Sequence, residues 1–255
     1  MILHSKEFGE GQPLVILHGL FGSSDNWQTL ARVFAEKHRV FIVDQRNHGH
    51  SEHSIDEFNY ELMSQDLHQF ITHHNLSNVI LLGHSMGGKT VMQYVMDYGT
   101  ELIDKMIVAD IGPKQYPLHH DLILEALTTT NFTVMNSRKL VDEHLSKFID
   151  QIGVRQFLLK NLYWVEKGKL AWRFNVDVLN RDIANIVAAI AGDTVELPTL
   201  FIRGELSNYI TDADIEDIAE QFPLAKIDTI AGVGHWLHAE APQEFIQKVN
   251  DFIKA

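Results

Sequence analysis

The stretch Val79-Ile80-Leu81-Leu82-Gly83-His84-Ser85-Met86-Gly87-Gly88 joins an apolar run to a glycine-rich turn with a serine at its centre. Four consecutive apolar residues at 79–82 predict a strand that is buried on both faces. The residues that follow the turn are apolar at helical spacing: Val91, Met92 and Val95. The stretch therefore predicts a strand, a sharp turn and a helix, which is the connection that a parallel sheet requires.

The turn itself matches G-x-S-x-G, the pattern of a nucleophile elbow. An elbow holds its serine in a strained backbone conformation while the neighbouring chain passes close by, so only glycine fits at Gly83 and Gly87. Ser85 Oγ then projects above a helix N-terminus, which favours a developing negative charge. Five residues of this pattern also occur by chance in a turn with an unreactive serine. The strand before the turn and the helix after it favour Ser85 as a nucleophile.

The same alternation of strands and helices extends outward from this turn. Buried strands are predicted at 13–17, 40–43, 106–109 and 197–202, with amphipathic helices between them and a final helix carrying Phe245, Val249 and Phe252. Residues 113–195 lack strand-like runs and are predicted to be helical, with Ser137 as the cap of one helix. We expect an α/β core at 1–112 and 196–255 with a helical cap at 113–195. The alternative is extra helical packing on the same core.

Composition excludes several classes of protein. The chain has 255 residues, of which 45% are hydrophobic and 22% charged, so it suits one large globular domain. A formal charge of −13 argues against a nucleic-acid partner, and no apolar run has the length of a membrane span. The N-terminal residues do not resemble a signal peptide, and the absence of cysteine fits a reducing compartment. We therefore expect a cytoplasmic protein; its oligomeric state does not follow from the sequence.

Two further segments supply the expected partners of Ser85. The strand at 13–17 runs into His18-Gly19, which frees the Leu20 amide to form an oxyanion hole together with the Met86 amide. A base is expected after the serine in the chain, and His235 lies between the last predicted strand and the last helix. His238 is the nearest competitor for this role.

In combination these motifs resemble the α/β-hydrolase superfamily, and more narrowly the YbfF-type esterases, whose relatives include mitochondrial hydrolases and a yeast alcohol acetyltransferase. The segments that carry the resemblance are His18-Gly19, 44–51, 83–89 and 234–240. The resemblance implies an eight-stranded, mostly parallel sheet with a helical cap, and activity on short acyl esters or acyl-CoA thioesters. It also implies that the loop 44–51 braces the site without taking part in catalysis.

The acid of the expected triad departs from the common pattern. Most superfamily members carry Gly-x-x-Asp after the strand equivalent to 198–203, but here the sequence is Gly204-Glu205-Leu206-Ser207. Loss of the acid in serine proteases costs about 10⁴ in kcat, so a replacement is expected elsewhere. Asp110 ends the neighbouring strand and is the preferred candidate, as it is in the YbfF group. The alternatives are Glu205, Asp212 and Asp214, or a plain turn-capping role for Asp110. On sequence grounds Ser207 itself should be dispensable.

The sequence thus favours a serine esterase that cleaves short-to-medium acyl esters or thioesters through an acyl-serine intermediate, with no metal ion or organic cofactor. A substrate pocket is expected from the apolar side chains of Phe21, Trp164 and Trp236. Two alternatives remain open: an acyltransferase with an alcohol acceptor, and a non-catalytic binding protein on the same scaffold. Dehalogenases and epoxide hydrolases are disfavoured because they need aspartate at position 85.

Overall fold

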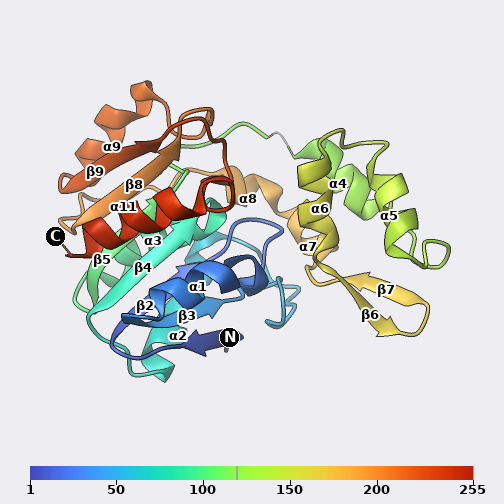
Figure 1. Cartoon of the computed structure of the whole chain (residues 1–255), viewed down its shortest axis with the longest axis horizontal. Coiled ribbons are helices and arrows are strands. Elements are labelled where there is room, and N and C mark those ends of the chain that lie inside the picture. The colour runs from blue at the N-terminus through green and yellow to red at the C-terminus, as the bar shows by residue number, and fades with distance from the viewer. Residues whose placement is uncertain (119, 255) are drawn as a thin grey trace.

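The computed structural model describes residues 1–118 and 120–254 and is built around one twisted sheet (Figure 1). In the described residues this sheet has seven strands in the order β1-β3-β2-β4-β5-β8-β9. All neighbouring strands are parallel except β1, which is antiparallel to β3. The strands are β1 Ser5–Phe8, β2 Gln12–Leu17, β3 His38–Val43, β4 Val79–His84, β5 Ile103–Ala109, β8 Thr199–Gly204 and β9 Ala225–Ile230.

The expectation of eight strands is therefore corrected to seven. Ahead of β1, the described residues form no further strand. His4 contributes its carbonyl oxygen to the Asp44 amide beyond the end of β3, and the Met1 ammonium binds Asp66 in α2 Tyr60–His73. The first residues are thus held by the sheet and by α2, but they do not form a strand beside β1.

Both faces of the sheet are covered by helices, as the apolar strands require. In β2, Leu14 and Ile16 pack on one face, and Val15 and Leu17 pack on the other. The first face is covered by α1 Gln28–Phe34 and α11 Pro242–Lys254, and the second by α2 and α3 Met86–Tyr98. The remaining elements of the core are the 3₁₀ helices η1 Ser24–Trp27 and η2 Asp212–Asp214, and the helices α9 Ile215–Gln221 and α10 Leu237–Glu240.

Residues 113–195 contribute no strand to the main sheet and lie to one side of it (Figure 1). Their elements are α4 Asp121–Thr128, α5 Arg138–Leu145, α6 Ile152–Leu159, β6 Leu162–Glu166, β7 Lys169–Trp172, α7 Val176–Arg181 and α8 Ile183–Val187. Ser137 caps α5 by accepting a hydrogen bond from the Leu140 amide, as its sequence position predicts. Many buried side chains of this segment join the same apolar cluster as one face of the sheet. The division into a core and a cap stays a prediction.

The expectation that this segment is wholly helical is wrong at one place. β6 and β7 form an antiparallel hairpin, with Glu166 opposite Lys169. Gly168 has φ +85° and sits in the turn of this hairpin. The hairpin buries only Leu162, Leu170 and Trp172, so its apolar pattern is too sparse to reveal a strand.

Lys89 connects this segment to the core. Its side chain is 1% exposed, and its ammonium donates hydrogen bonds to the carbonyl oxygen of Lys114 at 2.7 Å and to that of Ala188. The rings of Tyr60 and Tyr116 lie beside the ammonium, with centroids 5.9 and 4.9 Å away. Burial lowers the pKa of Lys89 to about 7, while the carbonyl oxygens and the rings favour the charged form. Because Lys114 precedes α4 and Ala188 follows α8, one side chain of α3 holds both ends of the segment.

No helix among the described residues is both long and apolar enough to cross a bilayer.

Candidate active site

Ser85 occupies the turn between β4 and α3, with φ 52° and ψ −120°. This conformation is strained for any residue with a side chain and persists only where the surroundings enforce it. The Ser85 amide donates to the carbonyl oxygen of Ala109 at the end of β5 (3.0 Å), and its own carbonyl accepts from the Lys89 amide in the first turn of α3 (3.1 Å). Backbone bonds to a neighbouring strand and to the following helix therefore hold the serine in place.

The two glycines of the elbow are required by close backbone contacts. A Cβ atom on Gly87 would lie 2.5 Å from the carbonyl oxygen of Leu17, at the end of β2. A Cβ atom on Gly83 would lie closer still to the carbonyl oxygen of Gly87. The prediction that only glycine fits at these two positions is confirmed.

Asp110 lies directly after β5 and is completely buried. Its Oδ2 accepts a hydrogen bond from His235 Nδ1 at 2.8 Å, and its Oδ1 accepts one from the Gly204 amide at 3.1 Å. The structure thus brings together the two side chains that the sequence pairs. Since the carboxylate accepts at Nδ1, the proton of the neutral imidazole resides there and Nε2 is left as an acceptor.

The other candidate acids are engaged elsewhere. Glu205 accepts from the Gly232 amide at 2.7 Å, Asp212 pairs with Arg203 at 2.7 Å, and Asp214 pairs with Lys114 at 2.7 Å. His238 is buried and stacks on Trp27, with 4.4 Å between ring centroids. Burial lowers the pKa of His238 to about 3, which makes it a poor proton acceptor.

Ser207 has a contact that sequence reasoning missed. Its hydroxyl donates a hydrogen bond to Asp110 Oδ2, the oxygen that also binds His235. The expectation that Ser207 is dispensable therefore needs correction, because its removal deprives a buried carboxylate of a donor. The sequence position of Ser207 could have revealed this contact. Ser207 occupies the usual position of the acid, so its side chain lies close to His235 and Asp110 even though the acid comes from another strand.

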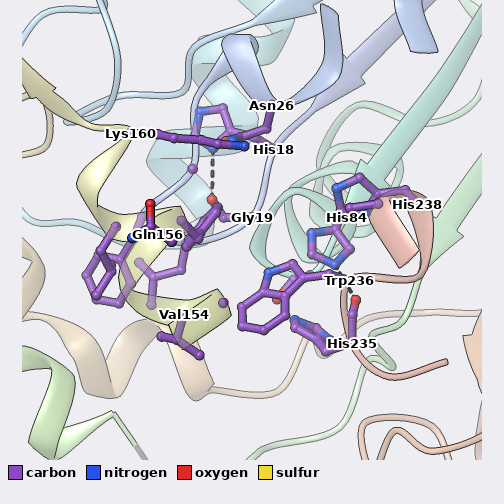
Figure 2. A pocket seen from close by; sticks show the side chains of 18 of the residues that line it. His18, Gly19, Asn26, His84, Val154, Gln156, Lys160, His235, Trp236 and His238 are labelled. Atoms are coloured by element: carbon purple, nitrogen blue, oxygen red, sulfur yellow. Dashed lines mark hydrogen bonds between the residues drawn. The ribbon is translucent and has the colours of Figure 1, made fainter. Parts of the chain in front are cut away.

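Tyr209 is a second residue of the site that the sequence analysis did not single out. Its ring stacks on the His235 imidazole, with centroids 4.0 Å apart and planes inclined by 19°. The His235 carbonyl accepts a hydrogen bond from His84 Nε2 at 2.9 Å (Figure 2). His235 is thus fixed through its ring nitrogen, its ring face and its backbone.

The amides of Leu20 and Met86 are free of protein acceptors within the described part of the chain. Met86 is the first residue of α3, so no intrahelical acceptor exists for its N–H. Leu20, Ser85 and Met86 line one common cavity. The two amides are therefore available to a ligand beside the serine, as an oxyanion hole requires.

The loop after β2 is held by the loop after β3. His18 Nε2 accepts from the Gln45 amide at 3.0 Å, and His48 Nε2 accepts from the Phe21 amide at 3.2 Å. The buried Asp44 accepts from the Ser24 amide at 2.6 Å. These bonds are consistent with the bracing role that the family resemblance implies for residues 44–51.

A cavity of about 560 Å³ lies between this centre and the segment 113–195 (Figure 2). Ser85 and His235 both line it, although no hydrogen bond joins their side chains within residues 1–118 and 120–254. Such bonds are often long in unliganded enzymes and shorten when substrate binds. Phe21 and Trp236 line the cavity as predicted, together with Val154 and Phe157 of α6, which the sequence did not single out.

The prediction that Trp164 lines the substrate pocket is wrong. It lies on the exposed hairpin strand β6, its side chain is 55% exposed, and it does not border the cavity.

Within the described ranges, no group of three or more His, Cys, Asp or Glu side chains could hold a metal ion.

Comparison with known proteins identifies the family. The model of the alpha/beta hydrolase fold matches residues 12–142, just over half of the chain. The chain belongs to the α/β-hydrolase family. It is 36% identical over 242 residues to the esterase YbfF of Escherichia coli strain K12, covering 94% of this chain and 92% of that protein. It is also 36% identical over 249 residues to the sn-1-specific diacylglycerol lipase ABHD11 of Mus musculus, covering 94% and 80%.

A solved structure agrees over almost the whole chain. A marine microorganism esterase superimposes with a TM-score of 0.95 and 45% sequence identity, covering 98% of this chain and 99% of that one. These relatives place the α/β-hydrolase described here among esterases and lipases, and they confirm the fold expected from the resemblance.

The elbow contact gives a stability prediction. Gly83→Ala forces a methyl group against backbone, and we expect a loss of roughly 3 kcal/mol or more in the free energy of unfolding, measured by denaturant titration. Gly153→Ala is the matched control, because Gly153 lies in α6 with no atom within 4 Å of an added Cβ. Equal unfolding midpoints for Gly83→Ala and wild type would show that the contact is not close.

The buried histidines predict acid sensitivity. Burial lowers the pKa of His48 and of His238 from 6.5 to about 3. Between pH 6.5 and 3 the unfolded chain takes up protons that the folded protein does not, so stability is complete above pH 6.5 and is lost as the pH falls. Each group contributes up to about 1.4 kcal/mol per pH unit.

Unfolding midpoints between pH 8 and 4.5 measure this slope. His238→Phe, which keeps a ring on Trp27, should reduce the slope. An unchanged slope for His238→Phe would refute the assignment of His238 as a neutral buried group.

Proposed function

We propose that this protein is a carboxylesterase that hydrolyses acyl esters through an acyl-serine intermediate. The observation that carries the proposal is the 2.8 Å bond from His235 Nδ1 to the buried Asp110, beside a serine held in an elbow on a shared cavity. Ser85 is the nucleophile, His235 the base and Asp110 the acid. Membership in a family of esterases and lipases supports the reaction type.

The acylation step follows from the arrangement of these groups. His235 Nε2 takes the hydroxyl proton as Ser85 Oγ bonds to the acyl carbon, and the carbonyl oxygen becomes an anion bound by the Leu20 and Met86 amides. Asp110 stabilises the imidazolium and keeps its orientation. The imidazolium then protonates the leaving alcohol oxygen as the ester C–O bond breaks.

Deacylation repeats these steps with water. His235 Nε2 accepts a proton from the attacking water, the tetrahedral intermediate collapses, and the proton returns to Ser85 Oγ as the carboxylic acid leaves. No metal ion or organic cofactor takes part in this scheme. The substrates proposed are short-to-medium acyl esters and acyl thioesters, in the cytoplasm, with residues 113–195 acting as the cap that encloses them.

The triad is tested by hydrolysis of p-nitrophenyl esters. Asp110→Asn keeps the shape of the side chain but removes its charge, and we expect kcat to fall by about 10⁴. Ser207→Ala removes one of three donors to Asp110, and we expect a smaller loss of roughly tenfold. Near-wild-type kcat for Asp110→Asn would disprove the proposed triad.

A fluorophosphonate probe separates the enzyme from a non-catalytic scaffold. Stoichiometric labelling that Ser85→Ala abolishes supports the enzyme, and no labelling of folded wild type supports the binding protein.

Transfer to an alcohol is the alternative fate of the acyl group, since an alcohol can reach Ser85 through the same cavity as water. For a hydrolase, we expect added ethanol to yield ethyl ester in no greater proportion than the molar share of ethanol in the solvent. Chromatography of the products measures this ratio. An ester share well above that proportion would instead identify an acyltransferase.

A further inference from the structure

A second, smaller cavity touches Ser85. It has a volume of about 30 Å³, and its walls include Leu20 and Met86, the two residues whose amides have no protein acceptor in the described part of the chain. The rest of its wall comes largely from Tyr60, Ile111, Tyr116, Ile186 and Val187. Ile186 and Val187 end α8, so the far wall is made by the last helix of the segment 113–195.

The small cavity presents an apolar surface. The Tyr60 hydroxyl donates to the Ile186 carbonyl at 2.8 Å. The Tyr116 hydroxyl donates to the Tyr209 carbonyl and accepts from the Gly112 amide, both at 2.7 Å. Burial raises the pKa of both tyrosines, so neither ionises at neutral pH. With their hydroxyls satisfied, these residues offer ring faces and aliphatic carbon to a ligand.

The two cavities share Leu20, Ser85, His120 and Tyr209 in their walls and differ in the residues beyond them. His235 lines the large cavity and is absent from the wall of the small one, whereas Met86 lines the small cavity and is absent from the wall of the large one. In a serine hydrolase the imidazolium protonates the leaving oxygen, so the alcohol portion must lie on the side of the base. The acyl chain then extends to the other side, past the oxyanion donors.

We propose that the small cavity is the acyl subsite, that it limits the acyl chain to acetyl through butyryl, and that the large cavity holds a bulky alcohol or thiol portion. This inference rests on the proposed esterase function. A cavity needs about 10–15 Å³ to hold one water-sized group, so a cavity of about 30 Å³ has room for only a short aliphatic chain beyond the carbonyl carbon. The large cavity, at about 560 Å³, is in the range that holds a complete small molecule.

The end wall is firmly attached to the core. The Val187 carbonyl accepts from the Tyr116 amide at 2.8 Å, the Ile186 carbonyl accepts from Tyr60, and the next carbonyl, of Ala188, accepts from the Lys89 ammonium. Three consecutive carbonyls are therefore bound to groups outside α8. Longer acyl chains cannot displace this wall without breaking buried hydrogen bonds, so the enzyme should discriminate between substrates by the length of the acyl chain.

The test compares two substrate series on the intact chain. In p-nitrophenyl esters from acetate to octanoate, kcat/KM should fall at least tenfold beyond butyrate. In acetates of alcohols from methanol to naphthylmethanol, kcat/KM should stay level or rise. Octanoate hydrolysed as fast as acetate, or a steep fall with alcohol size, would overturn the assignment of the subsites.

Matched truncations locate the wall. Ile186→Ala enlarges the small cavity, and the ratio of kcat/KM for hexanoate to that for acetate should rise about tenfold over wild type. Val154→Ala removes a similar side chain from the large cavity and should leave this ratio unchanged. Val187→Ala provides a second truncation of the same wall if the first does not fold. An unchanged ratio in a folded variant of either wall residue would refute the inference.

A failure of the proposed esterase function can be distinguished from a failure of the proposed acyl subsite. If no ester is hydrolysed and fluorophosphonate does not label Ser85, the esterase assignment is wrong, and the acyl subsite that depends on it is wrong as well. If hydrolysis depends on Ser85 but long acyl chains are preferred, only the subsite is wrong.

Discussion

The close backbone contact between the β4–α3 turn and the end of β2 is the constraint around which this site is arranged. Gly87 lies against the carbonyl oxygen of Leu17 at a distance that leaves no room for a side chain. The contact forces Ser85 into a positive-φ conformation and sets the first amide of α3 beside the loop that follows β2. The proposed nucleophile and the proposed oxyanion donors are thus positioned by the same packing of main chain, without depending on flexible side chains.

The sequence predicts this part of the molecule because it depends on short-range patterns. The elbow glycines and the four-residue apolar strands are local signals, and strand order then places Asp110 and His235 at the same edge of the sheet. The edge strands β1 and β9 were not predicted, since neither has the continuous apolar run of a central strand. Trp164 shows the opposite failure: an aromatic residue between apolar neighbours suggested a pocket, but its strand belongs to an exposed hairpin.

Ser207 shows why the acid could be located but its surroundings could not. The sequence shows only that an aspartate is missing after β8 and that another ends β5. It does not show that the two positions converge, with the Ser207 hydroxyl and the Gly204 amide both donating to Asp110. A fully buried carboxylate needs several hydrogen-bond donors to replace the water that its oxygens have lost. Ser207, which stands where most superfamily members have the acid, therefore donates a hydrogen bond to the proposed acid, Asp110. The carboxylate comes from β5 instead of β8, but it binds the end of β8 and the loop that follows it.

Helix α3 links this centre to the specificity of the site. Its first residue, Met86, carries one of the two proposed oxyanion donors, and one turn later Lys89 holds the backbone at Lys114 and Ala188. The ammonium is buried among carbonyl oxygens and tyrosine rings, so releasing either end of the segment would leave a charge without adequate solvation. The distance between the nucleophile and the α8 wall is therefore set within a single helix. If the segment 113–195 were attached by flexible linkers alone, the proposed acyl space could vary, whereas this attachment fixes that space relative to Ser85.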